Sequence, residues 1–245
     1  VVIAVFGVNY AMDGAVMRTL KFEANRAIGA SVFDLQDIII NDNTVSIVSG
    51  TETLAIEIDE EGQLEYYDSY GTILKTNIRE SEQYYEIRFE DEKYKQLYRY
   101  IRIEGSLIKV YPWYATFDLY AMGNRTFRFV GLHGELINNI EKPESLGFVG
   151  KEKLGSGRGY IWSRTLPLLK DALVLGYGPD NFAVAFPQND YIGKIRAFSS
   201  GTNMIVDKPH NLYLQIATNT GVLSFLAFLA LAGIYVVQSI ITYIK

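Results

Sequence analysis

Two side chains that suit an anionic substrate stand in the C-terminal part of the chain, Arg158 and His210. A guanidinium is a planar, permanently charged fork that binds phosphate oxygens in pairs. An imidazole titrates near neutral pH, so it can accept a proton from a hydroxyl group or orient that group. Together they suit a reaction in which a phosphate group is held while an acceptor hydroxyl is activated. Arg158 could equally anchor a lipid headgroup or form a salt bridge in a loop.

Several neighbours could assist these two residues in binding a substrate. Arg164 is a second, weaker phosphate ligand, because a spacing of six residues puts it on another side of a helix from Arg158. Asn211 either fixes the orientation of the histidine or caps a helix. Gly176 and Gly178 are predicted to form a turn with positive φ, which would let the backbone approach a substrate.

Metal and nucleotide chemistry have little support in the sequence. The chain has no cysteine and only two histidines, and it lacks Asp-x-Asp, Walker and Gly-x-Gly-x-x-Gly motifs. A net charge of −5 argues against a nucleic-acid partner. We therefore predict no metal, no cofactor and no nucleic acid.

A membrane-spanning helix is predicted at residues 222–244. These 23 residues carry no charge and would extend about 35 Å as a helix, which is enough to cross a bilayer. His210 precedes this span by about three helical turns, so it should lie near the lipid headgroups. The single Lys245 beyond the span favours an external location for the preceding residues.

The apolar residues 1–12 are interpreted as the end of another membrane helix, and a helix is expected to leave the membrane over residues 13–33. A buried strand or helix of a soluble domain is the alternative for residues 1–12. With two spans, residues 13–221 would all lie on one side of the membrane. We expect a multi-pass protein of the cell membrane, with this loop on the periplasmic or extracellular side.

A strand-rich region follows, with β-branched and aromatic runs separated by turn residues such as Asp59 to Gly62 and Asp68 to Gly71. It predicts eight to ten antiparallel strands in a sandwich or open barrel. Aromatic residues at 111, 113 and 114 could stack on sugars, but we favour packing within the fold, with Trp113 in the core. The predicted strands are residues 38–40, 45–48, 54–58, 64–67, 84–89, 98–103, 107–111, 116–120 and 126–130.

The texture becomes helical and loop-like after residue 145, and the charge changes sign. Residues 1–150 carry a net charge of −9 and residues 151–245 a net charge of +4, with five basic residues between 151 and 170. We predict a helix interrupted by Pro167, a short helix capped by Asp180, a loop over residues 188–207, and a helix that begins at Pro209 and carries His210.

Three motifs in this order resemble the O-antigen ligase and polymerase family of bacterial membrane glycosyltransferases. They are GSGRGYIW at residues 155–162, GYGPDNF at 176–182, and His-Asn at 210–211 with nine residues before Gly221. The resemblance covers residues 150–235, so the strand-rich region looks like an insertion in a large external loop. Arg158 matches the arginine of the family, and His210 its histidine.

The resemblance implies a metal-independent enzyme that moves a glycan from an undecaprenyl pyrophosphate carrier to the hydroxyl of an acceptor glycan or lipid. Other membrane helices of the same protein would complete the site, so the chain by itself is expected to be inactive. The alternative is a non-catalytic, membrane-anchored β module that binds cell-wall glycan or a partner protein. Whether the enzyme is a ligase or a polymerase stays open.

The predicted fold class is α+β. We expect four parts: membrane helix end and external helix at 1–33, antiparallel β domain at 34–145, motif region of helices and loops at 146–221, and transmembrane helix at 222–245.

Overall fold

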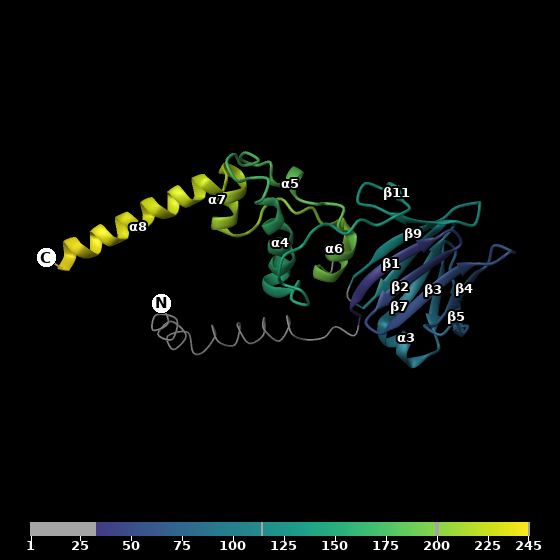
Figure 1. The fold of residues 1–245 in the computed structure, drawn as a ribbon. Helices are drawn as coiled ribbons and strands as arrows, with labels where there is room; N and C mark the ends of the chain where they lie inside the picture. The colour runs from purple at the N-terminus through teal and green to yellow at the C-terminus, as the bar shows by residue number, and fades with distance from the viewer. Residues whose placement is uncertain (1–32, 114, 199–200, 245) are drawn as a thin grey trace. The chain divides into compact units, whose positions relative to one another are not determined.

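The computed structural model describes residues 33–113, 115–198 and 201–244 (Figure 1). The expected helices within residues 1–32 lie outside these residues. Two compact units divide the chain. Among the described residues, the β unit contains those from 33 to 142 together with 151–157 and those from 189 to 204, and the helical unit contains 143–150, 158–188 and 205–244.

Four antiparallel strands form the first sheet of the β unit in sequence order: β1 (Leu35–Asn41), β2 (Thr44–Ser49), β3 (Glu52–Ile58) and β4 (Leu64–Tyr67). The predicted turns around this sheet are present. Asp59 Oδ1 accepts hydrogen bonds from the amides of Glu61 and Gln63, and Asp68 Oδ1 does the same for Tyr70 and Thr72. Such Asx turns replace the backbone pairing that ends with the strand.

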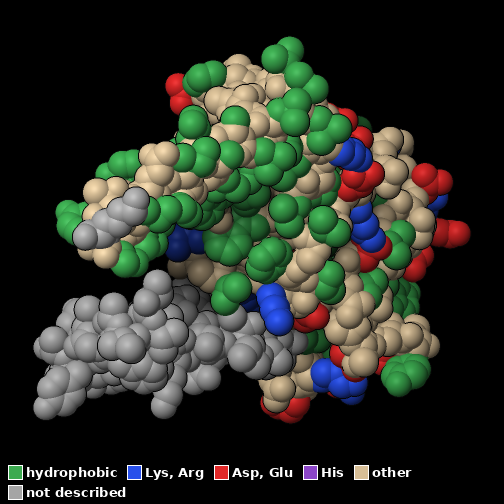
Figure 2. Space-filling view, turned by 60° about the vertical axis from the view of Figure 1, so that its left-hand side comes forward, with side chains coloured by type: hydrophobic (Ala, Val, Ile, Leu, Met, Phe, Trp, Pro, Cys, Tyr) green, Lys and Arg blue, Asp and Glu red, His purple; other side chains and the backbone are tan. Residues whose placement is uncertain are grey.

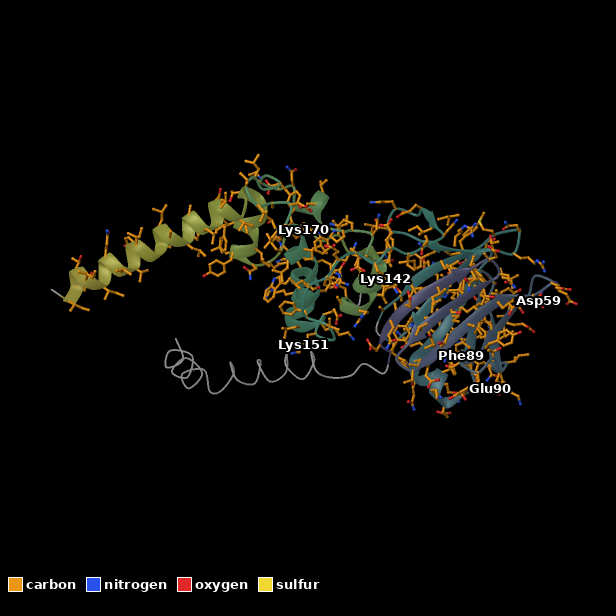
Figure 3. All side chains as sticks on the ribbon, in the orientation of Figure 1. Asp59, Phe89, Glu90, Lys142, Lys151 and Lys170 are labelled. Atoms are coloured by element: carbon orange, nitrogen blue, oxygen red, sulfur yellow. The ribbon has the colours of Figure 1, made fainter. Side chains whose placement is uncertain are left out.

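Seven antiparallel strands form the second sheet, each beside its sequence neighbour: β5 (Thr76–Glu80), β6 (Tyr85–Phe89), β7 (Tyr98–Glu104), β8 (Leu107–Pro112), β9 (Phe117–Ala121), β10 (Phe127–Val130) and β11 (Leu136–Ile137). The short helix α3 (Glu92–Leu97) joins β6 to β7. Asp59 and Glu90 lie beyond the ends of strands, whereas Phe89 lies within the sheet (Figure 3).

One hydrophobic core joins the two sheets. It takes alternate residues from both, including Ile47 and Ile56 from the first sheet and Ile101, Val110 and Phe129 from the second, all fully buried. The period-two alternation in the sequence therefore reports which face of each strand is buried. The predicted α+β fold with an antiparallel β region is confirmed.

Some local predictions for the β unit were wrong. The helix α3 was not predicted, and it begins where Asp91 accepts hydrogen bonds from two backbone amides. Trp113 was assigned to the core, yet 62% of its surface is exposed, and its indole N–H donates to the Lys95 carbonyl. The polar edge strand β5 and the two-residue β11 were not predicted, because neither shows an apolar alternation.

The predicted loop over residues 188–207 was also wrong. It contains α6 (Tyr191–Ala197) and the 3-10 turn η1 (Gly201–Asn203). Asp190 caps α6, and Lys194 on this helix is fully buried. Burial lowers the pKa of Lys194 to about 8, and the charge of Asp190 opposes this shift only in part.

The helical unit is built on α4 (Leu154–Leu168), whose first residues belong to the β unit, and on α5 (Phe182–Ala185), α7 (Leu212–Thr220) and α8 (Val222–Ile244). Pro167 lies in the last turn of α4 rather than at the middle of a longer helix. The expected capping of α5 by Asp180 was wrong, because Asn181 is the N-cap residue and makes no capping bond with its side chain.

The predicted C-terminal span is a continuous helix. The 23 residues of α8 include none that is buried, and their length and composition suit a membrane crossing. Figure 2 shows hydrophobic side chains along the visible side of this helix, and its sequence contains no Lys, Arg, Asp or Glu.

Candidate functional site

Arg158 begins the regular part of α4. The three residues before it, Gly155, Ser156 and Gly157, have positive φ angles of 60°, 61° and 91° and therefore kink the helix. A Cβ atom at Gly157 would lie 2.1 Å from Cε1 of Phe198, so glycine is required there for space as well as for φ. The Arg158 side chain is exposed, and among the described residues it makes no hydrogen bond or ion pair.

A hydrogen bond ties the segment before His210 to the same helix. Nε1 of Trp162 donates to the Pro209 carbonyl oxygen at 2.9 Å, and the Trp162 ring packs edge-on against Phe148. Arg158 and Trp162 are four residues apart, so they share one face of α4. The helix face that carries Arg158 is therefore the one that holds the backbone next to His210.

His210 occupies an unusual backbone conformation just before α7. Its φ angle is 50°, which few residues other than glycine adopt, and its side chain is exposed. Asn211 follows as the N-cap and accepts hydrogen bonds from the amides of Tyr213 and Leu214 at 3.0 and 3.2 Å. The prediction that Pro209 begins this helix was wrong, and the capping alternative for Asn211 is confirmed.

A loop at residues 172–178 joins α7 to α8 by four backbone hydrogen bonds, and we call it the junction clamp. The amides of Tyr177 and Gly178 donate to the carbonyls of Thr218 and Asn219 at the end of α7, at 2.8 and 3.0 Å. The carbonyls at 172 and 173 accept from the first two amides of α8, at 2.8 and 3.0 Å. Backbone groups at a helix end next to lipid need such partners.

The motif glycines allow the backbone of the junction clamp to lie close to the backbone at the end of α7. A Cβ atom at Gly176 would lie 2.3 Å from the Asn219 carbonyl carbon, and one at Gly221 would lie 2.5 Å from the Val174 oxygen. The predicted positive φ is present at Gly178, at 91°, but not at Gly176. In this structure both Gly176 and Gly178 contact the end of α7 through their backbones, which is a positioning role.

Arg164 is held by its own helix. Its Nη1 donates to Ser163 Oγ at 3.0 Å, and its guanidinium lies 5.2 Å from the centre of the Tyr160 ring. Two residues beyond Trp162, it points to the opposite side of α4 from that side chain. Arg164 is therefore placed less openly than Arg158 for a ligand on the Trp162 face.

The remaining described cations of the helical unit are paired. Lys170 bonds Glu144, which raises the pKa of that lysine, and Lys208 lies 3.6 Å from Asp207. Figure 3 labels Lys170, just beyond the end of α4. The described part of this unit therefore presents one exposed guanidinium without a carboxylate partner, and an anion can approach it without first displacing an ion pair.

Sequence reasoning missed Trp162 and residues 172–174. A tryptophan four residues after Arg158 was a usable signal, because indole N–H groups take partners at interfaces between apolar and polar surroundings. Residues 172–174 act through their backbone and have no side-chain signature. Within the described residues, no group of three or more Asp, Glu and His side chains could hold a metal ion.

One comparison with known proteins gives a match. A family model described as O-antigen ligase matches residues 105–229, from the turn before β8 to the first turns of α8. The match includes Arg158, the junction clamp and His210, and it extends further into the strand-rich region than the motifs themselves do. No curated protein and no solved structure matches the chain.

Proposed function

The chain belongs to the O-antigen ligase family, and on that premise we propose that it transfers a glycan from an undecaprenyl pyrophosphate carrier to an acceptor hydroxyl without a metal ion. The family supports a ligase- or polymerase-type function in general, glycosyltransferase-like activity on lipid-linked glycan, and a membrane-integral protein.

Arg158 would bind the pyrophosphate. Negative charge grows on the bridging oxygen as the bond between glycan and phosphate breaks, and a fixed cation there stabilises the transition state more than the ground state. The exposed guanidinium, free of ion pairs within the described residues, supports this role. Arg164 is the weaker candidate because Ser163 and Tyr160 already engage its guanidinium.

His210 would accept the proton of the acceptor hydroxyl or orient that hydroxyl beside the carrier. The observation that carries the proposal is the hydrogen bond from Trp162 to the Pro209 carbonyl oxygen. It holds the histidine segment against the helix face of Arg158, as a shared substrate requires. Asn211, as the helix cap, would contribute by fixing the backbone rather than by touching the substrate.

The height of this site relative to the membrane suits a lipid-borne diphosphate. Helix α7 has nine residues, or about 13 Å, so only this length and the two residues that flank the helix separate His210 from the start of α8. A carrier lipid keeps its hydrocarbon tail in the bilayer and its diphosphate at headgroup level. A site beside the N-terminal end of α8 can bind the diphosphate while the hydrocarbon tail stays in the bilayer.

Two substitutions in the intact membrane protein test the proposal. His210→Asn keeps a residue that tolerates positive φ but removes the imidazole, and Arg158→Gln removes the charge at similar length. Each should reduce polymer in cells by about 100-fold, since a lost general base or a lost charge contact has effects of this order. Carrier-linked glycan should accumulate in both variants.

Lys170→Gln is the matched control, because it also removes one exposed cation from the same unit. It should leave polymer at the level of the unmodified protein. Immunoblots of the membrane fraction would show that all three variants are inserted equally. If polymer were unchanged in His210→Asn and Arg158→Gln, the catalytic assignment would fall, and a binding role for the β unit would be favoured.

A further inference from the structure

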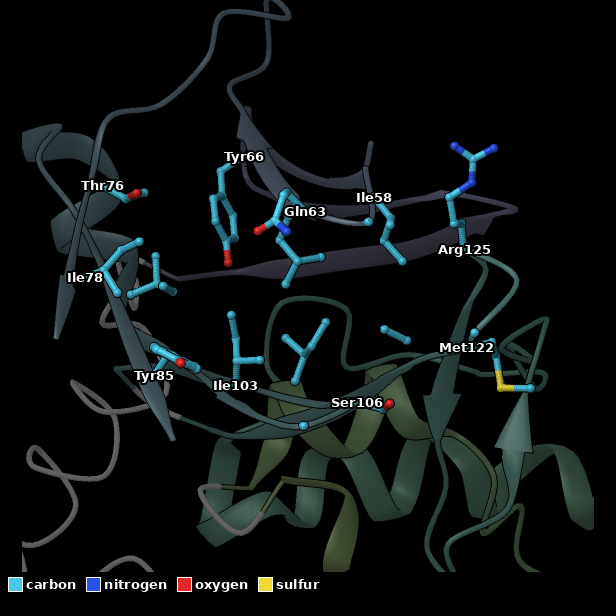
Figure 4. A pocket seen from close by; sticks show the side chains of 17 residues that line it. Ile58, Gln63, Tyr66, Thr76, Ile78, Tyr85, Ile103, Ser106, Met122 and Arg125 are labelled. Atoms are coloured by element: carbon cyan, nitrogen blue, oxygen red, sulfur yellow. The ribbon is translucent and has the colours of Figure 1, made fainter. Parts of the chain in front are cut away.

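A cavity of about 690 Å³ lies between the two sheets of the β unit (Figure 4). Its walls come from the ends of strands and from three hairpin turns, those of β3–β4, β7–β8 and β9–β10. The side chains that face it from both sheets are mostly aliphatic, among them Ile58, Leu64, Ile87, Ile103 and Ile108. A space of this size falls within the range that encloses small ligands.

The Tyr66 hydroxyl points into this cavity without a partner. Figure 4 shows the ring of Tyr66 descending from the first sheet with its oxygen toward the second. The residue is only 5% exposed, and within the described part of the chain its hydroxyl makes no hydrogen bond. Burial raises the pKa of this phenol, so it stays a neutral donor. Buried hydroxyls are nearly always bonded, so this donor is available to an acceptor that enters the cavity.

The walls decide what kind of molecule could supply that acceptor. Sugars favour aromatic faces and many hydrogen-bonding groups, whereas six of the seventeen lining residues are isoleucine or leucine and two are aromatic. Aliphatic side chains with a few hydroxyl and amide groups among them match a hydrocarbon chain that carries oxygen at one end. We propose that the cavity binds one aliphatic chain, such as an acyl chain, whose oxygen accepts the hydrogen bond of Tyr66.

The cavity opens to solvent, so such a chain has a way in. Ile78 and Tyr85 line it while remaining 66% and 47% exposed. Arg125 also lines it, and its Nη1 donates to the Asp59 carbonyl oxygen at 3.3 Å. An exposed guanidinium at the rim suits a carboxylate or phosphate at the polar end of the chain. A free fatty acid and a membrane lipid share this chemistry.

Photolabelling of the full chain in lipid nanodiscs tests the proposal. One arm supplies a diazirine-bearing palmitic acid from solution, and the other supplies a phospholipid whose acyl chain carries the diazirine. Mass spectrometry should locate label on residues 58–66 and 103–108. Label there from the first arm alone identifies a free amphiphile as the source, and label from the second identifies a membrane lipid. Label confined to α8 in both arms would overturn the proposal.

Two variants and their controls sharpen this test. Ser106→Trp fills the cavity from an exposed turn and should reduce labelling at least five-fold, whereas Gln83→Trp, in an exposed turn outside the cavity, should not. Tyr66→Phe keeps the ring and should weaken capture of palmitic acid about five-fold while leaving capture of a diazirine alkane unchanged. Equal capture by Tyr66→Phe, or unchanged labelling of Ser106→Trp, would refute the assigned site.

Discussion

Replacing Gly176 by alanine should open the junction clamp. The added methyl carbon would lie 2.3 Å from the Asn219 carbonyl carbon, where ordinary contact begins at 3.4 Å, so the two backbones must separate by roughly 1 Å. The hydrogen bonds from Tyr177 and Gly178, now 2.8 and 3.0 Å long, would then exceed 3.5 Å and be lost.

The size of the effect follows from these contacts. Two lost backbone hydrogen bonds contribute about 1–3 kcal/mol, and forced overpacking adds about 1–3 kcal/mol, so we expect a destabilisation of about 3 kcal/mol. For a chain of this length, that lowers the melting temperature by roughly 6–12 °C. Amide hydrogen exchange at Tyr177 and Gly178 should accelerate by about 100-fold, because 1.4 kcal/mol corresponds to a factor of ten.

The assay is thermal unfolding of the full-length protein in detergent, with hydrogen exchange resolved by peptide. Gly233→Ala in α8 is the control, because a Cβ atom there meets nothing within 4 Å and alanine favours helix. Gly178→Ala should fall between the two, since it brings strain from φ 91° and only one close contact, with Asn181. Equal melting of Gly176→Ala and Gly233→Ala, with unchanged exchange, would refute the clamp.

Three further predictions concern other parts of the structure. Lys194 has a pKa of about 8 in the folded chain and 10.5 in the unfolded chain. Between these pH values the unfolded chain therefore binds more protons than the folded one. The free energy of unfolding should rise by up to about 3 kcal/mol from pH 8 to 10.5. Lys194→Met should flatten that rise in denaturant titrations, and equal slopes would contradict the assignment. Trp162→Phe removes the N–H that donates to the Pro209 carbonyl oxygen and should lower polymer formation about ten-fold, while thermal melts show a destabilisation of only about 1 kcal/mol. An unchanged amount of polymer would show that this hydrogen bond does not position His210. Asn211→Ala should destabilise the protein by about 1 kcal/mol through the lost cap, whereas Asn211→Asp should melt within a degree or two of the unmodified protein.

The strands could be predicted because burial on one face leaves a period-two pattern. Val45 and Ile47 on β2 are fully buried, and Ser46 between them is not. The pattern fails where a strand has no buried face, as in β5, whose residues Asn77 to Glu80 are all exposed. It also gives no sign of α3, where the side chain of Asp91 starts a short helix whose buried residues, Tyr94 and Leu97, are three positions apart.

The sequence was enough to nominate the residues of the candidate site, but not to predict the contacts that hold them in place. Arg158 and His210 carry chemistry in their side chains, so motif and charge are enough to nominate them. The junction clamp consists of backbone hydrogen bonds between segments about 40–50 residues apart. In the sequence, only glycines indicate such backbone contacts. Gly176 was therefore recognised as special, but for its dihedral angles rather than for its contact with Asn219.

The support around His210 has a consequence for the proposed chemistry. A residue held at φ 50° is strained by about 1–3 kcal/mol, and such a conformation persists only when its surroundings fix it on both sides. Here Trp162 holds the residue before it, and the Asn211 cap holds the residue after it. Because folding supplies this order, binding of a lipid-linked substrate does not have to immobilise the histidine segment, and more of the interaction free energy remains for the transition state. A site that transfers a glycan requires its histidine to be held in place before the substrate binds, and the strained backbone and its hydrogen bonds provide this. A segment that only linked α4 to α8 would need neither.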